Sequence, residues 1–387
     1  MPFLEQLPPS FVDTIVLPIK IFLFIGLDVF DDTKTRFKNH CKLISFIIGL
    51  FIFLSGQIFF FCNVDEVGTD FLEVANAIPV LLLILQNVFK LRIIRKKDMI
   101  RCIILDIAEL WPNEFQSENK EEVMRNWNRR LKTFCDTVFK ITVSGIIVYV
   151  YLLILVYFLS WYGDGDTRYI YPFQLYYFLK IDSMKKYFIF YMTQAVAGAM
   201  IHTCIYLSSD LLLVALTVDV CILLRMLQYD LENIKVERSQ EESLAKLKDI
   251  VKTHQKLLRL TENLNEIFGS IMFTVVVFSS VILCFFGFLT IVVTAPLQLF
   301  KNLMSVLQIL FVVFYIMLPG QILSDTVSKL ESTAKFKNVA AVSQTPCKLR
   351  GLSYTDMNFN AFCKICSTAW SYLSLVNQMY QKGGWEV

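Results

Sequence analysis

The chain carries little charge and lacks the sequence motifs of common catalytic centres. Only 18% of its 387 residues are Asp, Glu, Lys or Arg, and the net charge of +3 gives no indication of a nucleic-acid partner. We find no H-E-x-x-H zinc motif, no G-x-S-x-G element and no P-loop lysine. Cys363 and Cys366 form a C-x-x-C without a second pair, which argues against a zinc or redox site. We therefore expect a protein that is not an enzyme and that needs no cofactor, metal or nucleic acid.

Hydrophobic residues are abundant instead. They make up 55% of the chain, and the mean hydropathy is +0.53, which is typical of membrane proteins. Seven stretches reach the length of about 20 apolar residues that a bilayer crossing requires. They cover 43–62, 72–91, 136–159, 187–218, 268–294, 302–324 and 359–381. The sequence thus predicts an all-α membrane protein with seven transmembrane helices, embedded in the lipid bilayer of the cell membrane.

Basic residues mark one side of this predicted bundle. Lys and Arg cluster before the first stretch, after the second and after the sixth, whereas the charged residues of the loop at 63–71 are all acidic. The positive-inside rule then places the N-terminus in the cytoplasm and, after seven crossings, the C-terminus outside. This is the reverse of a G-protein-coupled receptor. The composition of 98–110 and of 225–262 predicts cytoplasmic helices, and we expect the fourth and fifth spans to continue into the second of these segments and pack together; a solvated charged loop is the alternative there.

Three carboxylates interrupt the apolar stretches. Asp210 and Asp219 lie in or beside the fourth stretch and weaken it, and Asp325 follows the sixth. An ionisable residue within a membrane is either functional or paired with another polar group. Because the predicted topology puts all three near the cytoplasmic side, where water can reach, we favour structural pairing.

Several residues in the outer halves of different stretches could line an apolar binding cavity, although ordinary helix packing explains each of them as well. They are Asn76, Pro79, Tyr149, Leu153, Tyr157, Met192, Val196, Met200 and Phe311. The aromatic loop at 161–178, which includes Phe173, is suited to the membrane–water interface, and a few of its rings could shape a ligand entrance.

The last stretch is apolar on most faces and polar on one. Ser367, Ser371, Ser374, Gln378 and Gln381 follow each other in steps of four and three, which keeps them on one side of a helix. This side could bind neighbouring helices of the same chain through hydrogen bonds. It could equally face the same helix of neighbouring subunits around a water-filled path, where rings of Leu375 and Met379 would close a pore by excluding water.

The C-terminal half of the chain resembles the insect odorant receptors. Ser371-Tyr372, five residues, then Gln378-Met379 is similar to their C-terminal signature, and the approach to the last span (Ser343-Gln344-x-Pro346, then Gly351-Leu352) is similar too. The resemblance implies an odorant-specificity subunit of a heterotetrameric, ligand-gated, nonselective cation channel. Its partners would be the olfactory co-receptor Orco and a small volatile odorant, in the dendritic membrane of olfactory sensory neurons. Pore and gate positions would be Ser371, Ser374, Leu375, Gln378 and Met379.

The resemblance also divides the chain into parts. These are a cytoplasmic N-terminal segment (1–42), six membrane helices with an odorant-binding outer half (43–324) and cytoplasmic extensions (92–135 and 225–262), a cytoplasmic anchor segment (325–352), and a pore-lining seventh helix with an extracellular tail (353–387). The stretch between Asp325 and Ser343 is shorter than in the family by roughly one helix. Because of this shortening, a nonfunctional variant stays open as an alternative. A gustatory-type chemoreceptor channel is the other alternative.

Overall fold

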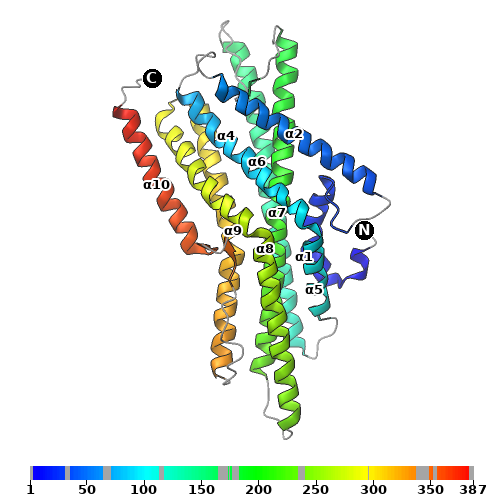
Figure 1. Ribbon diagram of the computed structural model, residues 1–387. Coiled ribbons are helices and arrows are strands. Elements are labelled where there is room, and N and C mark those ends of the chain that lie inside the picture. Colours follow the sequence, from blue (N-terminus) through cyan, green and yellow to red (C-terminus); the bar gives the residue numbers. More distant parts are fainter. Residues whose placement is uncertain are drawn as a thin grey trace.

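The computed structural model describes residues 3–30, 35–63, 71–112, 117–163, 173, 175–176, 183–233, 240–294, 296–336, 348–351 and 355–382. In these residues the chain is helical except for one pair of two-residue strands. The helices form an elongated bundle, in which the C-terminal helix runs along one side of the upper half and the N-terminal helix lies near mid-height (Figure 1). The all-α prediction is confirmed, with a small antiparallel hairpin added to it.

Six helices among the described residues are long and apolar enough to cross a membrane. They include α2 (Arg36–Cys62), α4 (Phe71–Lys90) continued by the 3₁₀ turn η2 (Leu91–Lys96) and α5 (Lys97–Leu110), α6 (Glu118–Gly163), α7 (Met184–Glu232), α8 (Gln240–Val292) and α9 (Pro296–Phe336). The seventh predicted stretch is α10 (Phe359–Lys382), whose 24 residues span about 36 Å at 1.5 Å per residue. Its polar side keeps it below the hydropathy of the other six.

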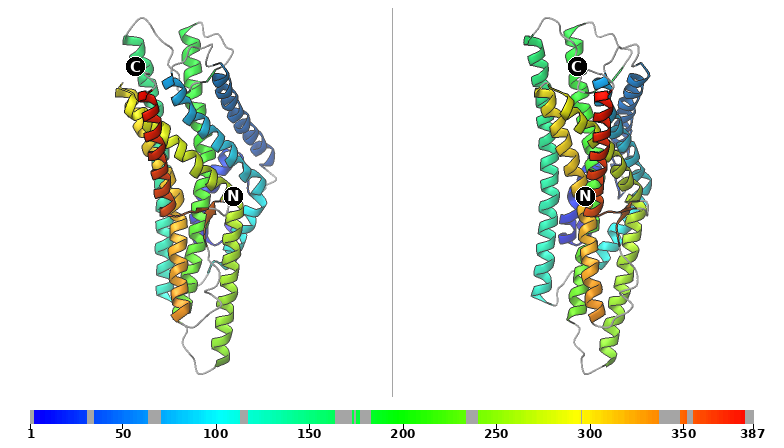
Figure 2. Two further views of the ribbon diagram at one scale, coloured as in Figure 1. Left: turned by 60° about the vertical axis from the view of Figure 1, so that its left-hand side comes forward. Right: turned by 90° about the vertical axis from the view of Figure 1, so that its left-hand side faces the viewer.

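The cytoplasmic extensions expected from the sequence are helical. Helix α7 continues without a break to Glu232, and α8 begins at Gln240, so the fourth and fifth stretches are the apolar parts of much longer helices. The two helices pack together, and the lower end of α8 projects beyond the rest of the bundle (Figure 2). Residues 234–239 of this segment lie outside the described residues, and Leu244 near the start of α8 is exposed. The orientation of the bundle across the membrane stays a prediction.

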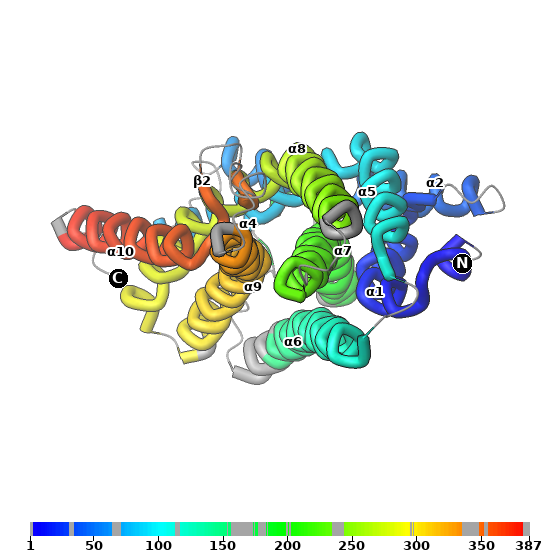
Figure 3. Tube along the Cα trace, turned by 90° about the horizontal axis from the view of Figure 1, so that it is seen from below, coloured from blue at the N-terminus to red at the C-terminus, as the bar shows by residue number. Residues whose placement is uncertain are grey.

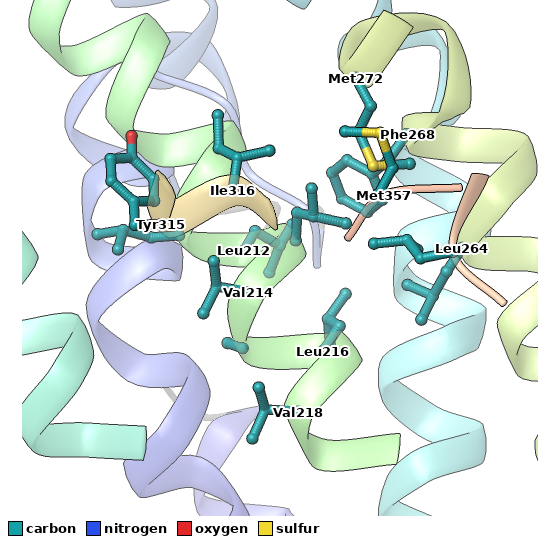
Figure 4. Packing of buried hydrophobic residues seen from close by; sticks show 14 of the residues in the cluster. Leu212, Val214, Leu216, Val218, Leu264, Phe268, Met272, Tyr315, Ile316 and Met357 are labelled. Atoms are coloured by element: carbon teal, nitrogen blue, oxygen red, sulfur yellow. The ribbon is translucent and has the colours of Figure 1, made fainter. Parts of the chain in front are cut away.

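Helix α7 is the central element. Seen from below, it lies between α6 and α8, with α1 (Pro9–Phe24), α5 and α9 around it (Figure 3). The most apolar 18-residue stretch of α7 is buried along its whole length. Figure 4 shows the packing around it: Leu212 and Leu216 of α7 lie among Ile316 of α9, Phe268 of α8 and Met357. A helix that is enclosed by other helices can carry polar groups that lipid would not accept.

Two of the three carboxylates are buried in this enclosed helix. Asp210 pairs with Lys90 of α4 at 2.7 Å, and Asp219 accepts a hydrogen bond from Thr14 of α1 at 3.1 Å. Structural pairing is therefore confirmed for Asp210. The expected access of water is wrong for these two, since Asp210 is 2% and Asp219 0% exposed. Asp325 is exposed and accepts a hydrogen bond from Gln321.

Sequence reasoning missed α1, which lies within the segment that we assigned to the cytoplasmic N-terminus. Its buried side includes Phe11, Ile15, Ile19 and Phe22, which recur every three or four residues and pack along α7 and α6. Pro9 at the first helical position is a typical start signal. The apolar repeat was therefore readable in the sequence, although 16 residues are too few to cross a bilayer.

The segment between α9 and α10 contains the hairpin of β1 (Arg350–Gly351) and β2 (Thr355–Asp356), in which Arg350 pairs with Asp356. Helix α9 continues to Phe336, so it includes residues 325–336 of the anchor segment predicted at 325–352. Residues 337–347, which include the end of the shortened stretch, lie outside the described residues. Asn265 of α8 holds the hairpin in place: its Nδ2 donates to the Lys348 carbonyl and its Oδ1 accepts from the Arg350 amide, each at 2.8 Å.

Candidate ligand cavity and gate helix

A cavity of about 170 Å³ lies between the helices of the bundle. Its volume is close to that of an engineered protein cavity of about 150 Å³ that takes up benzene. Helices α2, α4, α6, α7, α8 and α9 all contribute to its wall. The lining residues are Leu50, Phe53, Val80, Leu83, Ile84, Asn87, Thr142, Gly145, Ile146, Tyr149, Phe173, Gly198, Thr203, Tyr206, Leu207, Phe286, Ser305, Gln308, Ile309, Val312 and Tyr315. An apolar wall with a few polar groups is typical of sites for small organic ligands.

One wall of the cavity is aromatic and closely packed. Phe173, from the segment between α6 and α7, meets Phe53 edge-on with ring centroids 5.8 Å apart and lies 6.5 Å from the Tyr149 ring. A Cβ atom on Gly198 would lie 2.6 Å from a ring carbon of Phe173. Glycine at 198 therefore allows this ring to approach α7 and to form part of the wall. Phe173 of the aromatic loop thus lines the cavity, and the expectation that rings of this loop shape a ligand entrance stays a prediction.

The lower end of the cavity rests on a buried ion pair. Lys90 donates to Asp210 Oδ1 at 2.7 Å and to the Tyr206 carbonyl at 3.2 Å, and its Nζ lies 3.2 Å from the centre of the Tyr206 ring. The Tyr315 hydroxyl donates to Asp210 Oδ2 at 3.0 Å. Tyr206 and Tyr315 also line the cavity. A ligand in the cavity would therefore contact two side chains that hold the ion pair.

The ion pair joins three helices at a change in backbone geometry. Lys90 is the last residue of α4, Asp210 belongs to α7 and Tyr315 to α9, and the 3₁₀ turn η2 begins directly after Lys90. Both charged side chains are almost completely buried, at 1% and 2% exposed. Burial of two charges is favourable only when each is paired and hydrogen-bonded. Lys90 and Asp210 meet this condition through their mutual bond, the Tyr206 carbonyl and the Tyr315 hydroxyl.

The residues predicted to bind a ligand lie partly at the cavity and partly beside it. Tyr149 lines it. Phe311 packs on the Tyr315 ring, with ring centroids 5.5 Å apart, and Met192 packs, like Tyr149, against the buried cluster of Tyr187, Tyr191 and Ala195. Four others do not line the cavity. Asn76 donates a hydrogen bond within its own helix, Pro79 is buried next to the lining residue Val80, and Val196 and Met200 are each more than 40% exposed. The side chains of Leu153 and Tyr157 lie outside the described residues.

The sequence prediction missed most of the lining residues. They include apolar residues such as Leu83 and Ile309 and the small or polar residues Gly145, Thr142 and Ser305. A possible signal was Lys90 itself, because a lysine at the end of an apolar stretch together with Asp210 inside another suggests a buried pair. In the described part of the chain no cluster of three or more His, Cys, Asp or Glu could hold a metal ion.

Helix α10 has one packed and one exposed side. Ala361, Ile365 and Ala369 are buried against the bundle, where α10 contacts α8 and α9. The predicted pore and gate positions Ser371, Ser374, Leu375, Gln378 and Met379 are all exposed, Leu375 by 53% and Met379 by 65%. The hydroxyls of Ser371 and Ser374 donate to carbonyls one turn back in α10 itself. The polar side therefore faces away from the chain, and the interpretation that it binds helices of the same chain is wrong.

A tight joint connects α9 with the start of α10. Phe314 stacks on Phe359 with ring centroids 5.5 Å apart, and the Phe359 amide donates to Gln321 Oε1 at 3.3 Å. A Cβ atom on Gly320 would lie 1.8 Å from the Met357 carbonyl oxygen, so only glycine allows this approach. Pro319 precedes it and cannot donate a hydrogen bond to Tyr315 one turn back.

Neighbouring residues of α9 thus face the two candidate sites. Tyr315 lines the cavity, whereas Phe314 contacts the beginning of α10. A movement of α9 at this level would change both contacts at once.

The sequence profile of the 7tm odorant receptor family matches residues 70–334. The chain belongs to this family of insect odorant receptors. Odorant receptor 67a of Drosophila melanogaster is 20% identical to it, over 95% of this chain and 96% of its own length. Odorant receptor 85c of the same species is 31% identical over 34% of each chain.

Solved structures of this family have the same fold. The olfactory receptor OR5 of Machilis hrabei in complex with eugenol superimposes with a TM-score of 0.79 and 15% identity, over 96% of this chain and 100% of that one. A second structure of OR5 gives a TM-score of 0.76. This chain is thus an odorant receptor and a multi-pass membrane protein, a class of receptor and not of enzyme.

Proposed function

We propose that this odorant receptor is the specificity subunit of a heterotetrameric, nonselective cation channel that it forms with the co-receptor Orco. A small volatile occupies the cavity, and α10 lines the pore. The observation that carries the proposal is the exposed side of α10. A row of serine and glutamine side chains on an otherwise apolar membrane protein needs water or a polar partner, because hydrocarbon provides neither.

The residues of α10 divide between permeation and closure. Ser371, Ser374 and Gln378 provide a polar, uncharged surface, on which partly hydrated cations can pass. Leu375 and Met379 lie beside Gln378, and around a shared axis such side chains close the pore by excluding water. The orientation that fits this arrangement has the N-terminus in the cytoplasm, the C-terminus outside and the receptor in the dendritic membrane of sensory neurons.

Ligand binding opens the channel only if the ligand prefers the open state. A ligand that binds the open form tenfold more tightly stabilises it by about 1.4 kcal/mol relative to the closed form. Helices α8 and α9 both line the cavity and contact α10, and α9 does so through adjacent residues, Tyr315 at the cavity and Phe314 at α10. We infer that ligand contact with Tyr315 and Tyr206 shifts α9 and thereby the gate residues. The remaining predicted ligand residues stay candidates for the entrance.

The test of the proposal is co-expression with the co-receptor and measurement of odorant-evoked current. Gln378→Glu introduces a carboxylate on the exposed side of α10. We expect it to raise the permeability to divalent relative to monovalent cations, which is measured as a shift of the reversal potential. Asn377→Asp is the matched control, because its side chain points about 100° away around the helix. If both variants leave permeation unchanged in a working channel, the pore assignment is wrong.

Two other outcomes point to the alternatives. A current from this chain without the co-receptor favours a gustatory-type channel. Failure to reach the cell surface together with the co-receptor favours a nonfunctional variant, in which the short segment after Asp325 no longer supports assembly.

A further inference from the structure

Three hydroxyl groups of the cavity wall have already donated their only proton within the protein. Thr142 Oγ1 donates to the Val138 carbonyl at 2.8 Å, and Ser305 Oγ donates to the Lys301 carbonyl at 3.0 Å. The Tyr315 hydroxyl donates to Asp210 at 3.0 Å. A hydroxyl has one hydrogen and two lone pairs, so each of these groups has only acceptor capacity left for a ligand.

Of the three hydroxyl groups, that of Tyr315 has its proton held most strongly and is therefore the most restricted to accepting a hydrogen bond from a ligand. Its partner is a buried carboxylate, and hydrogen bonds to an ionised acceptor are roughly twice as strong as neutral ones. If Tyr315 turned its proton toward a ligand, Asp210 would lose a bond while it stays 2% exposed, and an unsatisfied buried acceptor is costly. Thr142 and Ser305 donate to neutral helix carbonyls, so their preference is the same in direction and smaller in size.

A ligand hydroxyl fits this wall better than a carbonyl does. Gln308 lies one helical turn from Ser305, and its amide can both donate and accept. A ketone, an ester or an ether has only lone pairs, and lone pairs that face the acceptor oxygens of Thr142, Ser305 or Tyr315 gain no bond. An alcohol can donate to one of these oxygens and still accept from an amide such as that of Gln308.

We propose that the cavity selects alcohols and phenols of about the size of one six-membered ring over the ketones and methyl ethers of the same skeleton. This inference rests on the proposed function of the cavity as the odorant site. Most other lining residues are apolar, with Asn87, Tyr149, Thr203 and Tyr206 as the further polar ones, so the ring contributes affinity. The hydroxyl then decides between molecules of equal shape.

The test uses cyclohexanol, cyclohexanone and methoxycyclohexane with the purified receptor complex. We expect the Kd of cyclohexanol to be lower by about five- to tenfold, the effect of one additional neutral hydrogen bond. Thr142→Val and Ser305→Ala, alone and together, should reduce this preference and leave the Kd of cyclohexanone unchanged. Thr193→Val is the control, because Thr193 makes the same bond within α7, to Ile189 at 2.8 Å, and does not line the cavity.

A variant whose cavity is filled distinguishes failure of the hydroxyl preference from failure of the proposed odorant site. A Cβ atom on Gly145 meets no atom within 4 Å, so Gly145→Leu places its side chain in the cavity and should weaken all three probes alike. If Gly145→Leu weakens all three while wild-type binds cyclohexanone as tightly as cyclohexanol, the hydroxyl preference is overturned and the odorant site remains. If Gly145→Leu changes no affinity, or if cyclohexanol does not bind, both proposals fail.

Discussion

Replacement of Lys90 by methionine would leave the Asp210 carboxylate buried in α7 without its ion-pair partner. The carboxylate would keep the Tyr315 hydroxyl as a donor but lose the Lys90 ammonium at 2.7 Å. Removal of one partner of a buried pair costs about 3–5 kcal/mol, since the other charge stays buried without compensation. We expect a loss of stability of this size for Lys90→Met and a comparable loss for Asp210→Leu, in which the lysine keeps its charge.

The double variant distinguishes this reasoning from a simple packing defect. When Lys90→Met and Asp210→Leu are combined, no charge remains, and such replacements are often neutral or stabilising. We therefore expect the double variant to be more stable than either single variant. The assay is thermal unfolding of the purified receptor, in which the height of the fluorescence-detected chromatographic peak of the folded protein is measured after heating. Cell-surface expression is the second measurement.

An exposed ion pair provides the matched control. Lys132 contacts Asp13 at 3.0 Å, with side chains 49% and 60% exposed. Surface pairs of this kind contribute about 0–1 kcal/mol, so Lys132→Met should be close to wild type. The reasoning is refuted if Lys90→Met is as stable as Lys132→Met, or if the double variant is no better than the sum of the two single ones.

Two further predictions concern the region between α9 and α10. Gly320→Ala should reduce odorant-evoked current more than odorant affinity, because its Cβ would collide with the Met357 carbonyl at the joint and not at the cavity; equal losses in binding and current would contradict this. At the hairpin, the Lys348 hydrogen bond lowers the pKa of Asp356, with the positive charges of Lys348 and Arg350 acting in the same direction and burial opposing them. The contact therefore stabilises the hairpin above the ordinary carboxyl pKa of about 3.9 and is lost as the pH falls through the lowered value. The protection factors of the hairpin amides, which are exchange rates corrected for the intrinsic rate at each pH, should be constant from about pH 8 to pH 5 and fall at more acidic pH. A midpoint near neutral pH would rule out this cause.

Much of the fold follows from hydrophobic length alone. Each of the seven predicted stretches coincides with a helix to within two residues at its ends or lies inside a longer one, because a run of about 20 apolar residues has few stable alternatives in a membrane. The ends were less predictable. Helices such as α6 and α8 continue far into polar sequence, where packing against neighbouring helices, and not hydropathy, decides where they end.

The candidate sites were predictable to different degrees. The exposed side of α10 follows from one periodic pattern within a single helix, and spacing is sufficient to read it. The cavity is built by six helices and a connecting segment, so its lining depends on how those helices are rotated against each other. Spacing within one helix carries little information on that rotation. Consequently Tyr149 was found, while Gly145, Thr142 and the ion-pair region were not.

The most direct test of the account is the reactivity of single cysteines on α10. In a background with Cys363 and Cys366 replaced by serine, cysteine is placed at Ser374 or Gln378 on the exposed side, or at Ala369 on the packed side. We predict that an aqueous thiol reagent modifies positions 374 and 378 faster when odorant is applied to the complex with the co-receptor, and that position 369 stays unreactive. If 374 and 378 do not react in either state, the exposed side of α10 does not meet water, and α10 does not line a pore.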